Sequence, residues 1–228
     1  TSEGYECEKI SIEKLKHFVS KEAFNIDGLG KKIVESFFNK KLIKLPHDIF
    51  TLNYSKIENM EGWGKQSVLN LKYSINSSKN ISFERFIYAL GIRHIGLENA
   101  KLISKNLKYA KNFLDLSKSN MFEELLNLDG MGETQINSLK NFFSNKTNID
   151  VLNKLFDTLS IKDSVEKNKN GPLKNKTFML TGKLQGMSRA EAKSLIEQNS
   201  GLIISNVSKS LNYLIIVDKP TKRKIDMA

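Results

Sequence analysis

The sequence predicts a mainly α-helical array of repeats followed by a small α/β domain. A short glycine-containing stretch occurs four times in the 228 residues, with its last glycine at Gly30, Gly64, Gly96 and Gly132, so the steps are 34, 32 and 36 residues. Apolar residues recur four and seven positions after each of these glycines, which places them on one face of an α-helix. From residue 172 onward the pattern changes to alternating strand and helix segments.

Each repeat is predicted to be two helices joined by a tight hairpin. Three copies, 26–30, 60–64 and 128–132, hold an apolar residue between two glycines, and a looser copy spans 90–96. Glycine permits the positive φ values that such a turn needs. The first N–H groups of the second helix have no partner within that helix, and they lie at the positive end of its dipole. These features together predict a phosphate-binding site at the hairpins.

The candidate DNA-binding residues are the hairpin glycines and the polar side chains beside them. They are Gly28, Gly30, Lys31, Lys32, Gly62, Gly64, Lys65, Gly91, Arg93, Gly96, Gly130, Gly132 and Thr134. The competing interpretation is a plain array of αα-hairpins that serves packing only. Arg93 also has two interpretations, a phosphate or minor-groove ligand and a salt-bridge partner that braces the turn. Trp63, at a hairpin tip, is expected to fill the core and not to enter a groove.

The formal net charge of +11 favours a polyanionic partner such as nucleic acid. Heavy use of Lys, Asn and Ile is also what AT-rich coding would produce, so the charge alone does not decide the partner. The single cysteine, Cys7, excludes an internal disulfide framework and fits a reducing cytosol. No signal peptide and no apolar stretch long enough for a bilayer is visible, so we expect a cytoplasmic protein with no membrane partner.

The repeats resemble the helix-hairpin-helix family of non-sequence-specific DNA-binding modules. Four in tandem, here residues 23–159, resemble the helix-hairpin-helix domain of bacterial NAD-dependent DNA ligases. A helix is expected over 10–19, and Cys7 precedes a segment, 15–20, that is similar to the exit of a four-cysteine zinc module in that family. The resemblance makes residues 1–22 a remnant of this module, with Cys7 as its fourth ligand. Because zinc needs four ligands, the chain completes a site only with ligands from elsewhere.

Residues 160–171 are polar and non-periodic, and they are predicted to be a flexible linker. Strands are then expected at 177–180, 202–205 and 212–217 and a helix at 188–198, which predicts a small sheet with parallel pairing. The segment 172–228 resembles a BRCT domain, an α/β/α sandwich, that stops before its last strand and helix. The resemblance makes Thr181, Gly182 and Lys224 a possible phosphate site, and a simple turn with a surface lysine is the alternative.

The order of these regions is similar to that of the C-terminal part of an NAD-dependent DNA ligase. That family seals nicks in duplex DNA during replication and repair, using NAD, Mg²⁺ and Zn²⁺. The resemblance implies that this chain clamps nicked double-stranded DNA in the bacterial cytoplasm, at the nucleoid, as a monomer beside the remaining ligase domains. The family's catalytic Lys-x-Asp-Gly motif is absent from the sequence, which begins at Thr1 and not at Met. We therefore expect a fragment that is inactive alone, with no catalytic residue and no bound cofactor.

Two other classes of protein are consistent with the same modules. One is a stand-alone DNA-repair scaffold that combines helix-hairpin-helix repeats with a BRCT domain. The other is a nuclease subunit that docks on DNA through its hairpins and would need a carboxylate metal cluster. The acidic pair Glu123 and Glu124 is interpreted as a solvated helix face and not as such a cluster.

Overall fold

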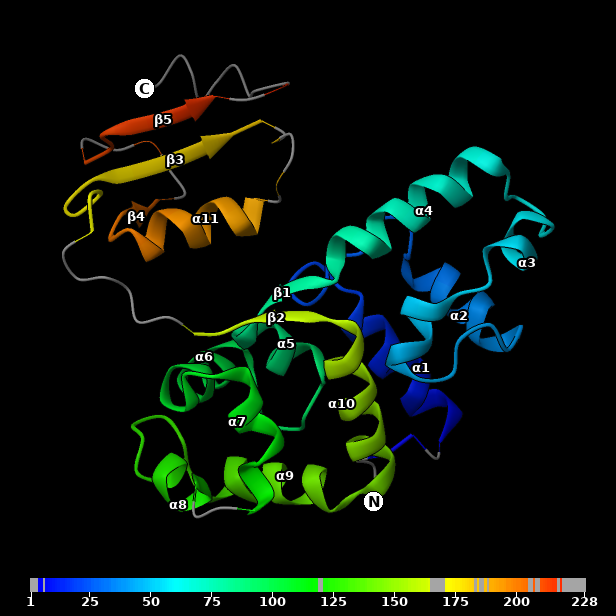
Figure 1. Cartoon of the computed structure of the whole chain (residues 1–228), viewed down its shortest axis with the longest axis horizontal. Coiled ribbons are helices and arrows are strands. Elements are labelled where there is room, and N and C mark those ends of the chain that lie inside the picture. The colour runs from blue at the N-terminus through cyan, green and yellow to red at the C-terminus, as the bar shows by residue number, and fades with distance from the viewer. Residues whose placement is uncertain are drawn as a thin grey trace. The chain divides into compact units, whose positions relative to one another are not determined.

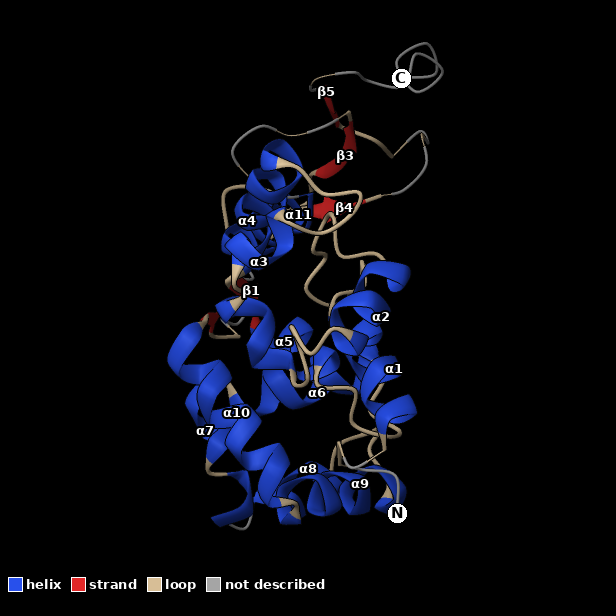
Figure 2. Cartoon of the chain, turned by 90° about the vertical axis from the view of Figure 1, so that its right-hand side faces the viewer, coloured by secondary structure: helices blue, strands red, loops and turns tan. Residues whose placement is uncertain are grey.

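Helices form nearly all of the regular structure in the first part of the chain, and a parallel sheet forms in the second part (Figures 1 and 2). The computed structural model describes residues 4–5, 7–118, 121–164, 171–182, 184, 187, 189–204, 207, 210–216 and 218. The chain divides into two units, Thr1–Ser164 and Val165–Ala228. The predicted fold class is confirmed. No helix among the described residues is both long and apolar enough to cross a membrane.

The first unit contains the four predicted repeats, each with a helix before and a helix after its hairpin (Figure 1). The pairs are α1 (Glu8–Phe18) with α2 (Lys31–Asn39), α3 (Tyr54–Glu58) with α4 (Lys65–Ser78), α5 (Phe83–Ala89) with α6 (Leu97–Leu107), and α8 (Met121–Leu126) with α9 (Glu133–Ser144). The connections carry the 3₁₀ helices η1 (Pro46–Thr51) and η2 (Leu116–Lys118) and the short helix α7 (Ala110–Leu114), and α10 (Lys146–Thr158) follows the last repeat.

The repeating apolar positions form one hydrophobic core, as the sequence predicts. The residues four and seven places after the last glycine of each hairpin are all buried: Val34, Phe37, Val68, Leu71, Ala100, Ile103, Ile136 and Leu139. Trp63 is half-buried against this core, and its ring lies 5.4 Å from that of Phe37. Its role is therefore packing, in agreement with the prediction.

A strand replaces the first residues of the predicted linker. β2 (Ser160–Lys162) pairs in parallel with β1 (Asn80–Ser82), and the N–H of Ser160 donates to the carbonyl of Lys79 (2.9 Å). The carboxylate of Asp163 then accepts from the N–H of Ala110 (2.8 Å). The prediction of a flexible linker over 160–171 is thus wrong for 160–163, and residues 165–170 lie outside the described residues. The two paired strands are 80 residues apart in the sequence, and the amino-acid composition of 160–163 gives no local indication of a strand.

The second unit is a three-stranded parallel sheet with a helix. β3 (Thr177–Thr181) lies between β4 (Leu202–Ile203) and β5 (Tyr213–Ile216), and α11 (Arg189–Gln198) connects β3 to β4. All three predicted strands occur, with the outer two shorter than expected. Ser188, the predicted helix cap, lies outside the described residues. Gly201 follows α11 closely enough that an added Cβ would lie 2.5 Å from Ile196 Cγ2, so packing excludes a side chain there.

Candidate nucleic-acid interface

The last glycine of each hairpin is the N-cap of the following helix. Gly30, Gly64, Gly96 and Gly132 directly precede α2, α4, α6 and α9, with φ between −65° and −147°. These backbone angles are open to any residue, so the turn itself does not require glycine there. A Cβ added at Gly30, Gly64 or Gly96 would meet no atom within 4 Å. The missing side chain therefore leaves open space in front of the helix, which fits the close approach of a ligand.

The glycine two positions earlier has a different role, because it adopts the left-handed conformation. Gly28, Gly62 and Gly130 have φ of 86°, 80° and 90°. In the third repeat the equivalent residue is His94, with φ of 60°. Gly91, which the sequence analysis includes among the candidate DNA-binding residues, lies outside this two-residue spacing. Gly91 instead follows the end of α5 at φ 61°, where an added Cβ would lie 3.3 Å from His17 Cδ2.

Backbone N–H groups at the helix starts are available to a ligand. The N–H groups of Gly30, Lys31 and Lys32 have no hydrogen-bond partner among the described residues. In two other repeats the third helical residue caps the glycine. Gly64 N–H donates to Ser67 Oγ (2.9 Å) and Gly132 N–H donates to Gln135 Oε1 (3.1 Å). The next N–H groups of these helices still point out of the helix end, in the arrangement that binds anions.

The charged side chains beside the hairpins determine how strongly each of the four candidate sites attracts an anion. Lys31, Lys32 and Lys65 are exposed in the first turns of α2 and α4, and each hairpin also has one carboxylate, Asp27 or Glu61. Arg93 is exposed and forms no ion pair with a described residue.

The fourth hairpin differs from the others in its charge. Residues 129–135 carry Asp129 and Glu133 and no cation, and the predicted ligand Thr134 is exposed as the second residue of α9. A carboxylate in the first turn already complements the helix dipole, and it repels a second anion. The fourth hairpin is therefore the least favourable of the four candidate phosphate sites.

Packing arranges the hairpins in two pairs. A Cβ added at Gly28 of the first hairpin would lie 3.6 Å from Leu71 Cδ1 on α4, the helix of the second repeat. A Cβ added at Gly130 of the fourth hairpin would lie 3.2 Å from Leu102 Cδ1 on α6, the helix of the third repeat. The first hairpin thus rests on the second repeat, and the fourth rests on the third.

Polar contacts join these two pairs of repeats. The Arg85 guanidinium on α5 donates to the carbonyls of Lys21 (3.1 Å), Glu22 (3.3 Å) and Ala23, in the turn after α1. His17 Nε2 on α1 donates to the carbonyl of Tyr88 (2.7 Å). Nothing in the sequence near Arg85 indicates these partners, which lie more than 60 residues away.

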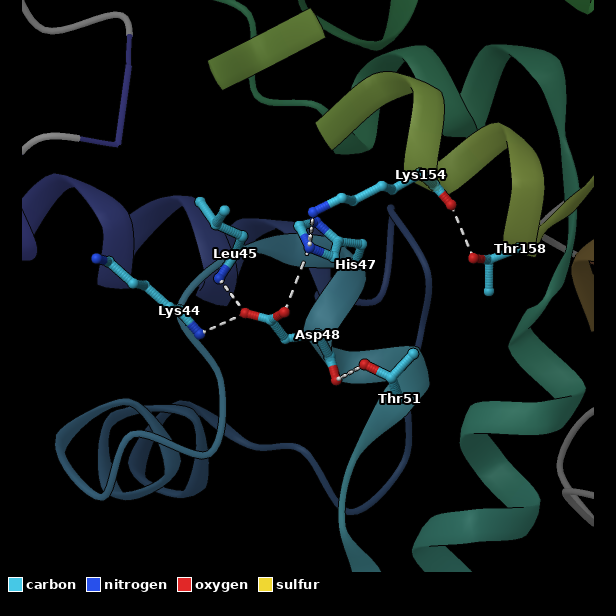
Figure 3. A network of polar contacts seen from close by, with 7 residues as sticks. All are labelled: Lys44, Leu45, His47, Asp48, Thr51, Lys154 and Thr158. Atoms are coloured by element: carbon cyan, nitrogen blue, oxygen red, sulfur yellow. Dashed lines mark hydrogen bonds and ion pairs between the residues drawn. The ribbon is translucent and has the colours of Figure 1, made fainter. Parts of the chain in front are cut away.

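A third contact links η1 to α10 (Figure 3). His47 Nε2 lies 3.4 Å from Lys154 Nζ and 3.3 Å from Asp48 Oδ1, and the His47 side chain is 13% exposed. Asp48 also accepts from the N–H groups of Lys44 and Leu45, at 2.9 and 2.8 Å. Burial lowers the pKa of His47 below its usual value, the carboxylate of Asp48 opposes this shift, and Lys154 adds to it. The neutral imidazole therefore accepts from the lysine near neutral pH.

The remaining predicted sites receive less support from the geometry. Thr181 ends β3 and is 1% exposed, Gly182 follows it at φ 101°, and Lys224 lies outside the described residues. A buried hydroxyl is a poor first contact for a phosphate, so the simple turn is the better account of this pair. Cys7 is exposed at the start of α1, and the described residues contain no group of three His, Cys, Asp or Glu side chains placed to hold a metal ion.

Two known protein families match the chain, one in each of its two units. The helix-hairpin-helix motif family matches residues 85–152, and the BRCA1 C Terminus (BRCT) domain family matches residues 168–228. The chain is 68% identical over 227 residues to a DNA ligase of Pelagibacter ubique (strain HTCC1062), an alignment that covers 100% of this chain and 34% of that protein. The chain is homologous to DNA ligases throughout its length.

More distant DNA ligases give the same alignment. Those of Rickettsia bellii (strain RML369-C) and Rickettsia canadensis (strain McKiel) are 41% and 42% identical. The alignments cover 93% and 96% of this chain but 32% and 34% of the two ligases. The chain thus spans about a third of the length of the curated relatives it matches. The third and fourth hairpins lie in the region that matches the helix-hairpin-helix motif family, and the small sheet lies in the region that matches the BRCT domain family.

Proposed function

We propose that this chain is the C-terminal, DNA-binding part of an NAD-dependent ligase that seals nicks in duplex DNA during replication and repair. The observation that carries the proposal is that four helices each begin directly after a glycine. Three of these glycines have open space where a side chain would lie, and the first N–H groups of each helix have no partner within that helix. Such ends bind phosphate oxygens through the backbone. Contacts of this kind position a protein on DNA but carry no sequence information.

The two pairs of hairpins suit a duplex better than a single strand. Each pair is held by its own packing, and Arg85, His17 and His47 fix the pairs relative to each other. Phosphates of both strands across the minor groove are then bound at fixed spacing, which a flexible single strand cannot match without losing conformational entropy. The ligase would close around a nick held in this way, as a monomer in the bacterial cytoplasm at the nucleoid.

Chemistry is assigned to the rest of the parent enzyme. The sequence has no Lys-x-Asp-Gly motif for adenylylation, so NAD and Mg²⁺ would be used by other ligase domains. For zinc, the described residues provide Cys7 alone, which does not make a site. We therefore assign this chain no step of nick sealing other than holding the DNA.

Competition binding tests the proposal. Purified chain is titrated with labelled nicked duplex, and unlabelled intact duplex or single strand of the same sequence competes. We expect both duplexes to compete well and the single strand to compete poorly, with no effect of changing the sequence. Preferred binding of single-stranded DNA, or no duplex binding at low salt, would overturn the proposal and leave the hairpins as packing elements.

A further inference from the structure

The four repeats serve as an internal comparison, and one of them differs on its surface. On α4, Leu69 is 58% exposed and Tyr73 is 74% exposed, although both are large and hydrophobic. They stand five and nine positions after Gly64. The equivalent positions of the other repeats are polar: Glu35 and Asn39, Lys101 and Lys105, Asn137 and Asn141. The repeat fold therefore does not require apolar residues there.

The core of α4 lies on its other side. Val68, Leu71 and Ile75 are buried, and Leu69 and Tyr73 lie one turn apart on the outer face. Exposed apolar side chains that lie next to each other mark candidate interaction sites, whereas scattered single ones do not. Figure 1 shows α4 running from the second hairpin, beside α3, to β1, so the helix that carries Leu69 and Tyr73 begins directly at the hairpin.

The charged residues on α4 indicate what kind of partner the helix binds. This 14-residue helix carries Lys65 and Lys72 and no carboxylate, and its other exposed side chains are amides and hydroxyls. Glu58 and Glu61 precede the helix, on the far side of Gly64 from Tyr73. Lysine, amide and hydroxyl donors bind phosphate and sugar oxygens, and apolar side chains contact deoxyribose and base edges in the minor groove. A helix without carboxylates that presents these groups fits a polyanion better than a protein domain.

We infer that Leu69 and Tyr73, with Lys65 and Lys72, form a second DNA-contact surface, the α4 surface, which extends the second hairpin along the duplex. The inference rests on the proposed function. Lys65 and Tyr73 are eight residues apart, so the surface spans about 12 Å along the helix. This equals roughly three to four base-pair steps of about 3.4 Å. The tyrosine ring packs on sugars, and its hydroxyl donates to a phosphate.

The first test replaces both apolar side chains by glutamine, which keeps helix propensity and adds no charge. We expect L69Q/Y73Q to bind the nicked duplex about tenfold more weakly than the wild type, the loss typical of important contact residues. The hydroxyl-radical footprint should shorten by about three to four base pairs. The slope of log affinity against log salt should not change, because no charge is removed. Tyr109→Gln is the control, since Tyr109 is also exposed (61%) but outside α4.

The second test uses Lys72→Gln, which we expect to reduce the salt slope by about 1, as loss of one phosphate contact does. Circular dichroism of each variant verifies folding. If the wild type binds the duplex but L69Q/Y73Q binds equally well with the same footprint, the α4 surface does not contact DNA, and the inference fails while the proposed function stands. If the wild type itself does not bind duplex DNA, both fail.

Discussion

Gly64 allows folding and DNA binding to be separated, because it caps α4 without needing to be glycine. Its φ of −147° suits any residue, and a Cβ there meets no atom within 4 Å. Asp and Asn are both better N-cap residues than Gly, by a few tenths of a kcal/mol. Asp also gains about 0.3–1 kcal/mol from the helix dipole. Gly64→Asp and Gly64→Asn are therefore expected to leave the free energy of unfolding unchanged or to raise it slightly.

The order of the two substitutions should be reversed in DNA binding, so that Gly64→Asp binds more weakly than Gly64→Asn. The aspartate carboxylate occupies the place of the bound phosphate, and two unit charges about 4 Å apart repel by roughly 1 kcal/mol in water and 4 kcal/mol near a protein surface. Since about 1.4 kcal/mol is a factor of ten, affinity should fall between about fivefold and several hundredfold. Asparagine has the same shape and no charge, so its loss should be much smaller.

Thermal unfolding and fluorescence anisotropy with a nicked duplex measure the two effects. Gly132→Asp is the matched control, because the fourth hairpin already carries Asp129 and Glu133 and should lose little affinity. The reasoning is refuted if Gly64→Asp binds DNA as well as Gly64→Asn does. It is also refuted if both variants unfold at a much lower temperature, since the glycine would then serve folding.

Three further predictions concern the scaffold that holds the hairpins. Gly62→Ala should lower the free energy of unfolding by about 1–2 kcal/mol, because φ of 80° strains any residue with a Cβ; urea unfolding with an unchanged midpoint would contradict this. Arg85→Lys should cost about 1–3 kcal/mol, because an ammonium cannot replace the forked donation to three carbonyls; equal stability would show that the carbonyls are hydrated instead. Burial holds the pKa of His47 below 6.5, so the unfolded chain binds a proton more readily between that lowered pKa and 6.5. Stability should therefore fall as the pH drops through this window, and His47→Gln, measured by unfolding between pH 5 and 8, should lose part of this slope; an unchanged slope would contradict it.

Local patterns predicted the helix starts and the core correctly for a physical reason. A glycine followed by apolar residues at offsets four and seven specifies a capped helix with one buried face, and both features depend only on near neighbours. All four second helices accordingly begin at the residue after the predicted glycine. Counting back two residues from Gly96 would also have identified His94 as the left-handed position.

The features that the sequence did not predict all depend on distant partners. The β1–β2 pairing joins residues 80 apart, and Arg85 and Lys154 reach partners more than 60 residues away. Neither composition nor periodicity specifies such contacts, since each needs the complete fold to bring the two sides together. The same holds for Thr181, whose burial follows from the sheet around it.

The central claim is that the hairpins bind DNA phosphates, and the salt dependence of duplex affinity tests it most directly. Each phosphate that a lysine or arginine neutralises contributes about −0.9 to the slope of log affinity against log salt concentration. The cations beside the first three hairpins, Lys31, Lys32, Lys65 and Arg93, then predict a slope between about −3 and −4 for the wild-type chain on a nicked duplex. A smaller magnitude for Gly64→Asp, by about 1, would assign one of these contacts to the second hairpin. A wild-type slope near zero, or no measurable affinity at low salt, would contradict the account.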